Sequence, residues 1–97
     1  MNKIILNDVE FEIESYNKNT YFAGDTINSN ASCSLANANV NALNTLAQTT
    51  ITVLQIQHDD NTIYELENIH AHINSINEYL SGDKMNVNIS LTFDNIE

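Results

Sequence analysis

Residues 85–93 alternate between apolar and polar side chains without a break, reading Met-Asn-Val-Asn-Ile-Ser-Leu-Thr-Phe. In an extended chain, successive side chains point to opposite faces, so the apolar groups share one face and Asn86, Asn88, Ser90 and Thr92 share the other. This predicts a strand that covers a hydrophobic core. The polar face lacks the Lys and Glu charges that usually keep a sheet from pairing with its neighbours, so the pattern also favours contact with another chain.

Alternation and turn-forming residues divide the rest of the chain into short segments. The stretch 69–80 is ambiguous, because its apolar residues fit both strand and helix spacing, and we favour a strand that breaks near Ser75. The predicted elements are, in order, a hairpin of residues 3–6 and 9–15 around Asn7 and Asp8, a loop of residues 16–25, a strand of 27–35, a helix of 37–48 capped by Asn37, two strands of 49–58 and 62–68 joined by a turn at 59–61, the strand of 69–80, a turn at 81–84, and the strand of 85–93.

These segments predict a mainly β fold, either a β-sandwich or a partly open barrel of six or seven antiparallel strands, with one short α-helix. Ninety-seven residues form a single domain, 1–97, which is large enough for one thin core. The predicted core consists of Phe11, Ile13, Cys33, Leu35, Val53, Leu66, Val87, Ile89, Leu91 and Phe93.

The charge of the chain excludes several classes of partner. It has 13 acidic residues against 3 basic ones, and its formal net charge is −10. Because nucleic-acid and membrane binding depend on Lys and Arg, direct binding to DNA, RNA or an anionic membrane is not expected. A basic protein surface would attract this chain.

Cysteine usage and apolar runs indicate where the protein is made. Cys33 is the single cysteine, so no internal disulfide forms, which fits a reducing compartment. No apolar stretch resembles a signal peptide or approaches the roughly 20 residues that span a bilayer. We expect the protein to be cytosolic at synthesis, or to belong to a particle that is assembled inside a cell.

Two patterns raise the question of metal binding. His70 and His72 share one face of a strand, and His58 precedes Asp59 and Asp60. Further ligands that would complete a zinc site are lacking, and the acidic turn lacks the glycine and the later glutamate of an EF-hand. We therefore expect solvated histidines, an ordinary turn, and neither metal nor cofactor.

No arrangement of residues indicates catalysis. A nucleophilic cysteine needs a histidine beside it, whereas Cys33 lies between Ala31 and Leu35 in a strand, where a small thiol serves as core packing. Paired carboxylates could exchange protons if burial separated their pKa values, but alternating glutamates more often form a solvated face. The chain is therefore predicted not to be an enzyme.

The candidate partner-binding residues are acidic and aromatic. An acidic face could attract a basic partner, and exposed aromatics are common anchors at interfaces. The aromatic residues have two interpretations: they bind a sugar or a protein pocket, or they fold back over the core. The candidates are Glu10, Glu12, Glu14, Tyr16, Tyr21, Phe22, Glu65 and Glu67.

The order of hairpin, strand, helix, hairpin and strand, with Asn, Ser and Thr along the strands, resembles small virion proteins of tailed bacteriophages of low-GC bacteria, particularly tail-tube and baseplate-type β-domains. Residues 51–93 carry most of this resemblance, with Asp59-Asp60-Asn61 at a hairpin and Ser81-Gly82-Asp83-Lys84 before the last strand. The resemblance implies a noncatalytic structural protein that packs β-sheets side by side and binds itself or another virion subunit.

Two other functions remain open at this stage. Small acidic phage proteins also resemble inhibitors of host defence systems, of the anti-CRISPR kind, whose carboxylates occupy a basic nucleic-acid-binding surface. The net charge of −10 favours that function. A carbohydrate-binding module would depend on Tyr16, Tyr21 and Phe22 alone.

Overall fold

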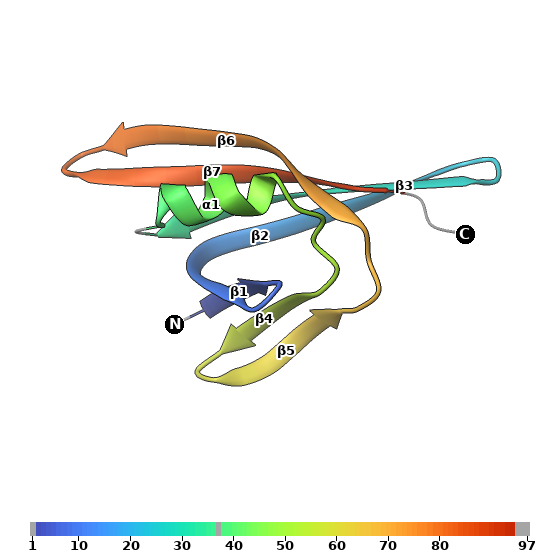
Figure 1. Cartoon of the computed structure of the whole chain (residues 1–97), viewed down its shortest axis with the longest axis horizontal. Helices are drawn as coiled ribbons and strands as arrows, with labels where there is room; N and C mark the ends of the chain where they lie inside the picture. Colours follow the sequence, from blue (N-terminus) through green and yellow to red (C-terminus); the bar gives the residue numbers. More distant parts are fainter. Residues whose placement is uncertain (1, 37, 95–97) are drawn as a thin grey trace.

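Seven antiparallel strands form one sheet, and one short helix packs against it (Figure 1). The computed structural model describes residues 2–36 and 38–94. The spatial order of the strands is β5-β4-β1-β2-β3-β7-β6. The predicted mainly β fold with a single short helix is confirmed. The elements are β1 (Asn2–Leu6), β2 (Val9–Ala23), β3 (Thr26–Ala36), α1 (Val40–Ala47), β4 (Leu54–His58), β5 (Asn61–Leu66), β6 (Ala71–Ser81) and β7 (Lys84–Phe93).

Two-residue turns connect the hairpins and set their registers. Asn7 and Asp8 have φ angles of 49° and 70°, and Asp59 and Asp60 have 49° and 69°. This left-handed backbone matches the twist of the flanking strands, and Asn and Asp tolerate it best after glycine. The hairpins predicted around residues 7–8, 59–61 and 81–84 are confirmed.

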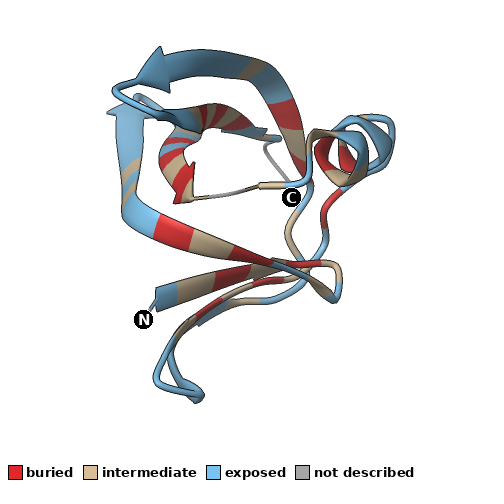
Figure 2. Cartoon of the chain, turned by 90° about the vertical axis from the view of Figure 1, so that its left-hand side faces the viewer, coloured by how far each residue is buried: buried red, intermediate tan, exposed pale blue. Residues whose placement is uncertain are grey.

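Register shifts interrupt three of the strand pairs, and those in β2–β3 and β6–β7 are bulges that bend the sheet around its core. One interrupts the β2–β3 register between Ile13 and Ser15, and the other interrupts β6–β7 between Ile73 and Ser75. Bulges bend a strand and increase its twist, and β2 turns sharply at its bulge (Figures 1 and 2). The strand break expected near Ser75 is therefore a bulge in a continuous strand.

The segment before β4 links the curled sheet to β6. Ile51 forms an isolated bridge with Ala71, with N···O distances of 2.8 and 2.9 Å. This contact, together with α1, leaves the sheet as a partly open barrel around the buried side chains (Figure 2). Within the described residues no helix has the length and apolarity needed to cross a membrane.

The core extends along the inner faces of most strands and one side of the helix. Seven of the ten predicted core residues are buried, while Val53, Leu66 and Phe93 are only partly buried. In β4, Leu54 and Ile56 point inward instead of Val53. The other buried residues, not predicted, are Ile4, Leu6, Ala31, Leu43, Leu46, Ile51, Leu54, Ile56, Ala71 and Ile73.

Three predicted boundaries were wrong. Residues 16–23 are not a loop but the outer part of β2, because their β-prone Tyr, Thr and Phe side chains pair with β3 and the real turn is Gly24–Asp25. The strand expected from residue 49 begins at Leu54. The helix begins after Asn39, whose side chain accepts hydrogen bonds from the amides of Asn41 and Ala42, and the proposed cap Asn37 lies outside the described residues.

The side chain of Asn7 fastens the β1–β2 turn to the segment that enters β4. Its Nδ2 donates to the Thr50 carbonyl at 2.9 Å, and its Oδ1 accepts from the Thr52 amide at 2.9 Å and from the Val53 amide at 3.3 Å. One residue therefore both forms the turn and positions the strand bridge at Ile51.

Candidate interaction surfaces

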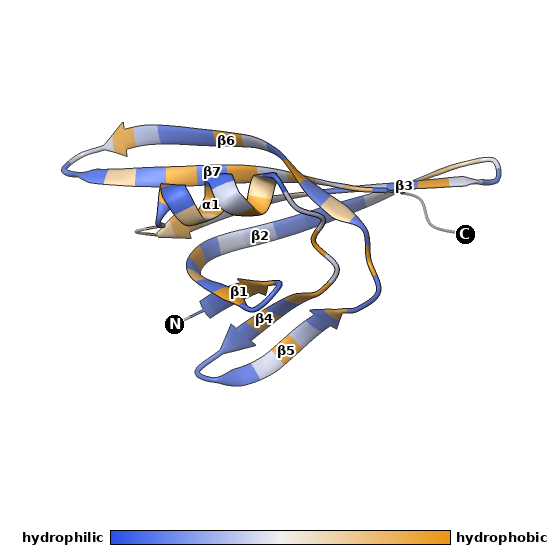
Figure 3. Cartoon of the chain, viewed as in Figure 1, coloured by the Kyte–Doolittle hydropathy of each residue, from blue (hydrophilic) through white to orange (hydrophobic). Residues whose placement is uncertain are grey.

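The outward face of β2, β3, β7 and β6 carries rows of uncharged polar side chains. Strand registers align these residues across all four strands, and polar and apolar residues alternate along β7 (Figure 3). We call this surface the polar array. Its three rows are Ser15–Ser34–Asn88–Asn77, Asn17–Ser32–Ser90–Ser75, and Asn19–Asn30–Thr92–His72.

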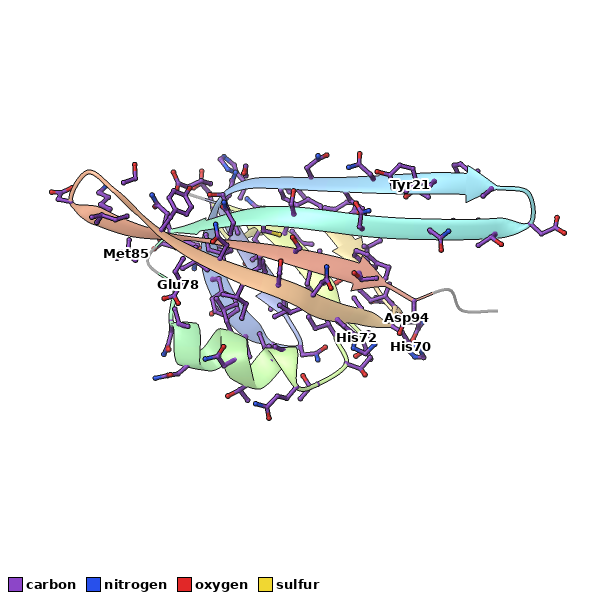
Figure 4. The ribbon with its side chains drawn as sticks, turned by 90° about the horizontal axis from the view of Figure 1, so that it is seen from above. Tyr21, His70, His72, Glu78, Met85 and Asp94 are labelled. Atoms are coloured by element: carbon purple, nitrogen blue, oxygen red, sulfur yellow. The ribbon has the colours of Figure 1, made fainter. Side chains whose placement is uncertain are left out.

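The polar array contains no carboxylate and no lysine, although the chain has 13 acids. Its one titratable member, His72, lies at the end of a row, where its Nε2 is 2.8 Å from Oδ2 of Asp94 (Figure 4). Charged side chains are one of the features that keep sheets from associating, and this surface lacks them. The sequence predicted the polar face of residues 85–93, whereas the alignment of polar residues across four strands depends on the strand order.

Three of the five acidic candidates share one face of the sheet, and the other two, Glu14 and Glu67, lie outside it. On the outward face of the other half of the sheet, cross-strand pairs place Glu10 and Glu65 in one row, separated by Ile5 and Gln55. Glu12 lies in the next row, beside Lys3. We call Glu10, Glu12 and Glu65 the acidic face.

Lys3 partly neutralises the acidic face, and the face contains fewer glutamates than the sequence predicted. The ammonium group of Lys3 lies 3.9 Å from Glu10 and 3.8 Å from Asp60. Glu14 occupies the β2 bulge, which breaks the expected row of three glutamates, and Glu67 follows the end of β5. Salt bridges between exposed groups contribute at most about 1 kcal/mol, so the surface remains open to a partner.

The outer halves of β2 and β3 extend past the rest of the sheet as a two-stranded arm. The last pair between β3 and β7 is Ser29 with Phe93, and the β2–β3 ladder continues beyond it to Ala23 and Thr26 (Figure 1). Phe22, with 76% of its area exposed, and Ile27 form a cross-strand pair on the face of the arm that continues the core. Tyr21 is exposed on the opposite face (Figure 4).

A recess of about 450 Å³ lies at the root of the arm, between β2 and the β4–β5 hairpin. The rings of Tyr16 and Tyr64 are 5.9 Å apart in its wall, and Lys18 lies nearby with its Nζ 5.1 Å from the centre of the Phe93 ring. Burial, followed by the neighbouring Tyr64 and Cys33, raises the pKa of Tyr16 above its usual range. Tyr16 is partly buried and packs against the core, whereas Tyr21 and Phe22 are exposed at the tip of the arm.

The opposite end of the molecule has its own exposed apolar tip. Next to the β6–β7 turn, Leu80 is 67% exposed and pairs across the strands with Met85, which is also exposed (Figure 4). The two tips lie at opposite ends of a molecule measuring 46 × 28 × 22 Å. Contiguous exposed apolar groups mark contact sites, and Leu80 and Met85 are direct cross-strand neighbours.

His58 and His72 each lie beside one carboxylate, that of Asp59 at 3.3 Å and that of Asp94 at 2.8 Å. Nδ1 of His58 lies 2.6 Å from Oδ1 of Asn2, and His72 pairs with Asp94. Among residues 2–36 and 38–94, no group of three His, Cys, Asp or Glu side chains could hold a metal ion. The absence of metal binding in solution stays a prediction.

Cys33 is buried, with 2% of its area exposed, and burial raises the pKa of its thiol to about 12. We expect negligible labelling by a thiol-specific reagent in the native protein at pH 8 and complete labelling in denaturant, because the thiolate is the reactive form. The folded pKa exceeds the unfolded one, so this group's stabilisation should decline as pH rises from about 9 towards 12. Rapid native labelling would contradict the buried placement.

Comparisons of the chain with known protein families, with curated proteins and with solved structures found no match.

Proposed function

We propose that this chain is a noncatalytic, phage-type structural or assembly protein that acts by binding other protein chains. The observation that carries the proposal is the polar array, whose twelve residues on the outward face of four strands include no carboxylate and no lysine. A soluble domain gains solubility from charges on such a face, so their exclusion favours a surface that is covered in use.

The two exposed apolar tips support the same function. Phe22 and Ile27 at one end, and Leu80 and Met85 at the other, provide anchors for contacts with subunits placed end to end. A building block of tail-tube or baseplate type would use such contacts after synthesis in the host cytoplasm. Its partners would be copies of itself or another virion subunit, with no nucleic acid and no cofactor.

The acidic face favours a second candidate, an inhibitor that occupies a basic nucleic-acid-binding surface of a host defence protein. Glu10, Glu12 and Glu65 could take the positions of phosphates. Lys3 lies among these carboxylates, which weakens such mimicry. The two functions differ in how their contacts respond to salt, because ionic contacts weaken as salt screens them and uncharged contacts do not.

Affinity capture from an infected host lysate, at low and at high salt, separates the two candidates. We expect a structural virion protein, identified by mass spectrometry, to be retained about equally at both salt concentrations. Recovery of a host nuclease or nucleotide-signalling protein that high salt releases, with no virion protein, would overturn the assembly function and favour the inhibitor.

A further inference from the structure

The outer part of β2 has an open edge. In the part of the chain that the structure describes, β2 pairs with β1 only up to Ile13, and from Ser15 to Ala23 it pairs with β3 alone. Seen from above, β2 is the outermost strand of the arm, with no strand beyond it (Figure 4). Open edges present unpaired backbone groups that template the addition of a further strand.

The turn of the arm determines which amides reach this edge. Ala23 and Thr26 close the two-residue turn as a hydrogen-bonded pair, and hydrogen-bonded and non-hydrogen-bonded pairs alternate along an antiparallel ladder. Alternate residues of β2 therefore direct both N–H and C=O away from β3. These residues are Tyr16, Lys18, Thr20 and Phe22.

This edge is complementary to itself. If two copies pair antiparallel about a two-fold axis at Asn19, each Tyr16 lies opposite Phe22 of the second copy, and each Lys18 lies opposite Thr20. All four outward-directed residues then meet in hydrogen-bonded pairs. Shifting the axis to residue 18 would oppose two lysines, and shifting it to residue 20 would place Gly24 opposite Tyr16 and lose the aromatic pair.

Charge also favours a second copy at this edge. Each chain carries a net charge of −10, yet residues 15–24 contain no acid and a single lysine, Lys18. Two copies therefore repel one another least along this stretch. The recess at the root of the arm, lined by Tyr16, Tyr64 and Ile63, adjoins the position that Phe22 of the second copy would take. Phe22 lies six positions after Tyr16, about 20 Å along the strand, so Phe22 cannot reach the recess of its own chain.

We propose that the chain forms a two-fold dimer in which the open edges of β2 pair antiparallel about Asn19 and each Phe22 packs against Tyr16 of the other copy. The dimer joins two arms into one four-stranded ribbon, β3-β2-β2-β3. This dimer rests on the proposed function, because it takes self-association as the role of the exposed surfaces. It adds which residues of β2 form the contact.

Disulfide trapping tests the register, with Cys33→Ala as the background. In the proposed dimer two Asn19 residues form a non-hydrogen-bonded pair with Cα atoms about 4.5 Å apart, which suits a disulfide. Asn19→Cys should therefore form covalent dimers under mild oxidation. Asn17→Cys is the matched control, because its counterparts would lie about 13 Å apart, beyond disulfide reach. Trapping at residue 17, or none at residue 19, would overturn the register.

Sedimentation velocity of the single-site variants tests the contact itself. Phe22→Asp should raise the dimer dissociation constant by about tenfold or more, as expected for loss of an aromatic anchor. Tyr79→Asp, the same aromatic-to-acid change at an exposed position of β6 outside the arm, should leave the constant unchanged. A wild-type chain that stays monomeric, or a dimer insensitive to Phe22→Asp, would overturn the inference. A monomer that still captures a virion subunit would overturn this dimer and leave the assembly function standing.

Discussion

Leu91→Ala should lower the free energy of unfolding by about 2–5 kcal/mol, the range for removing a fully buried leucine side chain. Leu91 has no exposed area and lies on β7 between Ala31 of β3 and Ile73 of β6, so the cavity would open in the middle of the sheet. Urea unfolding followed by circular dichroism gives the difference between variant and wild type.

Thr92→Ala is the matched control for this change. Thr92 is the next residue of β7 but belongs to the exposed polar array, so its truncation should alter stability by no more than about 0.5 kcal/mol. If Leu91→Ala cost less than about half a kcal/mol, or less than Thr92→Ala, the two faces of β7 would be assigned the wrong way round.

Asn7→Gly should destabilise the protein by about 2–3 kcal/mol, although glycine suits the turn better than asparagine does. Glycine adopts the φ of 49° without strain, so the loss reports only the side-chain bonds to Thr50, Thr52 and Val53. Chemical denaturation of the wild type and of Asn7→Gly under the same conditions measures this loss of stability.

Asp8→Gly is the control for Asn7→Gly, because it also places a glycine in the turn but leaves the side-chain hydrogen bonds of Asn7 in place. Asp8 has a φ of 70° in the same turn and is exposed. Its replacement should leave stability within about 0.5 kcal/mol of wild type. Equal losses at both positions would mean that Asn7 acts through the turn alone and not through the segment before β4.

Strict local patterns in the sequence predicted their elements correctly. Residues 85–93 alternate perfectly and form β7, and the paired turn residues Asn7–Asp8 and Asp59–Asp60 form the expected hairpins. The prediction failed for residues 16–23, where turn-forming residues, two tyrosines and a Phe-Ala-Gly step suggested a loop. Pairing with β3 and the β-propensity of the aromatic side chains outweighed the turn-forming residues.

The candidate surfaces depend on information that local patterns do not contain. The strand order brings β2, β3, β7 and β6 together, so the polar array arises from segments separated by most of the chain. A bulge after Ile13 adds one residue to β2, which turns Tyr16 inward and interrupts the row of glutamates. Periodicity alone identifies neither a strand's neighbours nor a one-residue insertion.

The most direct test of an uncharged assembly surface compares two variants for binding to the captured partner. Ser32→Glu with Ser90→Lys places an opposite-charge cross-strand pair in the middle of the polar array without changing the net charge, and Glu10→Gln with Glu12→Gln removes two charges from the acidic face. We predict that the array variant loses about tenfold or more in affinity, measured by titration calorimetry, while the acidic-face variant binds like wild type. Full binding by the array variant and loss by the acidic-face variant would contradict the account.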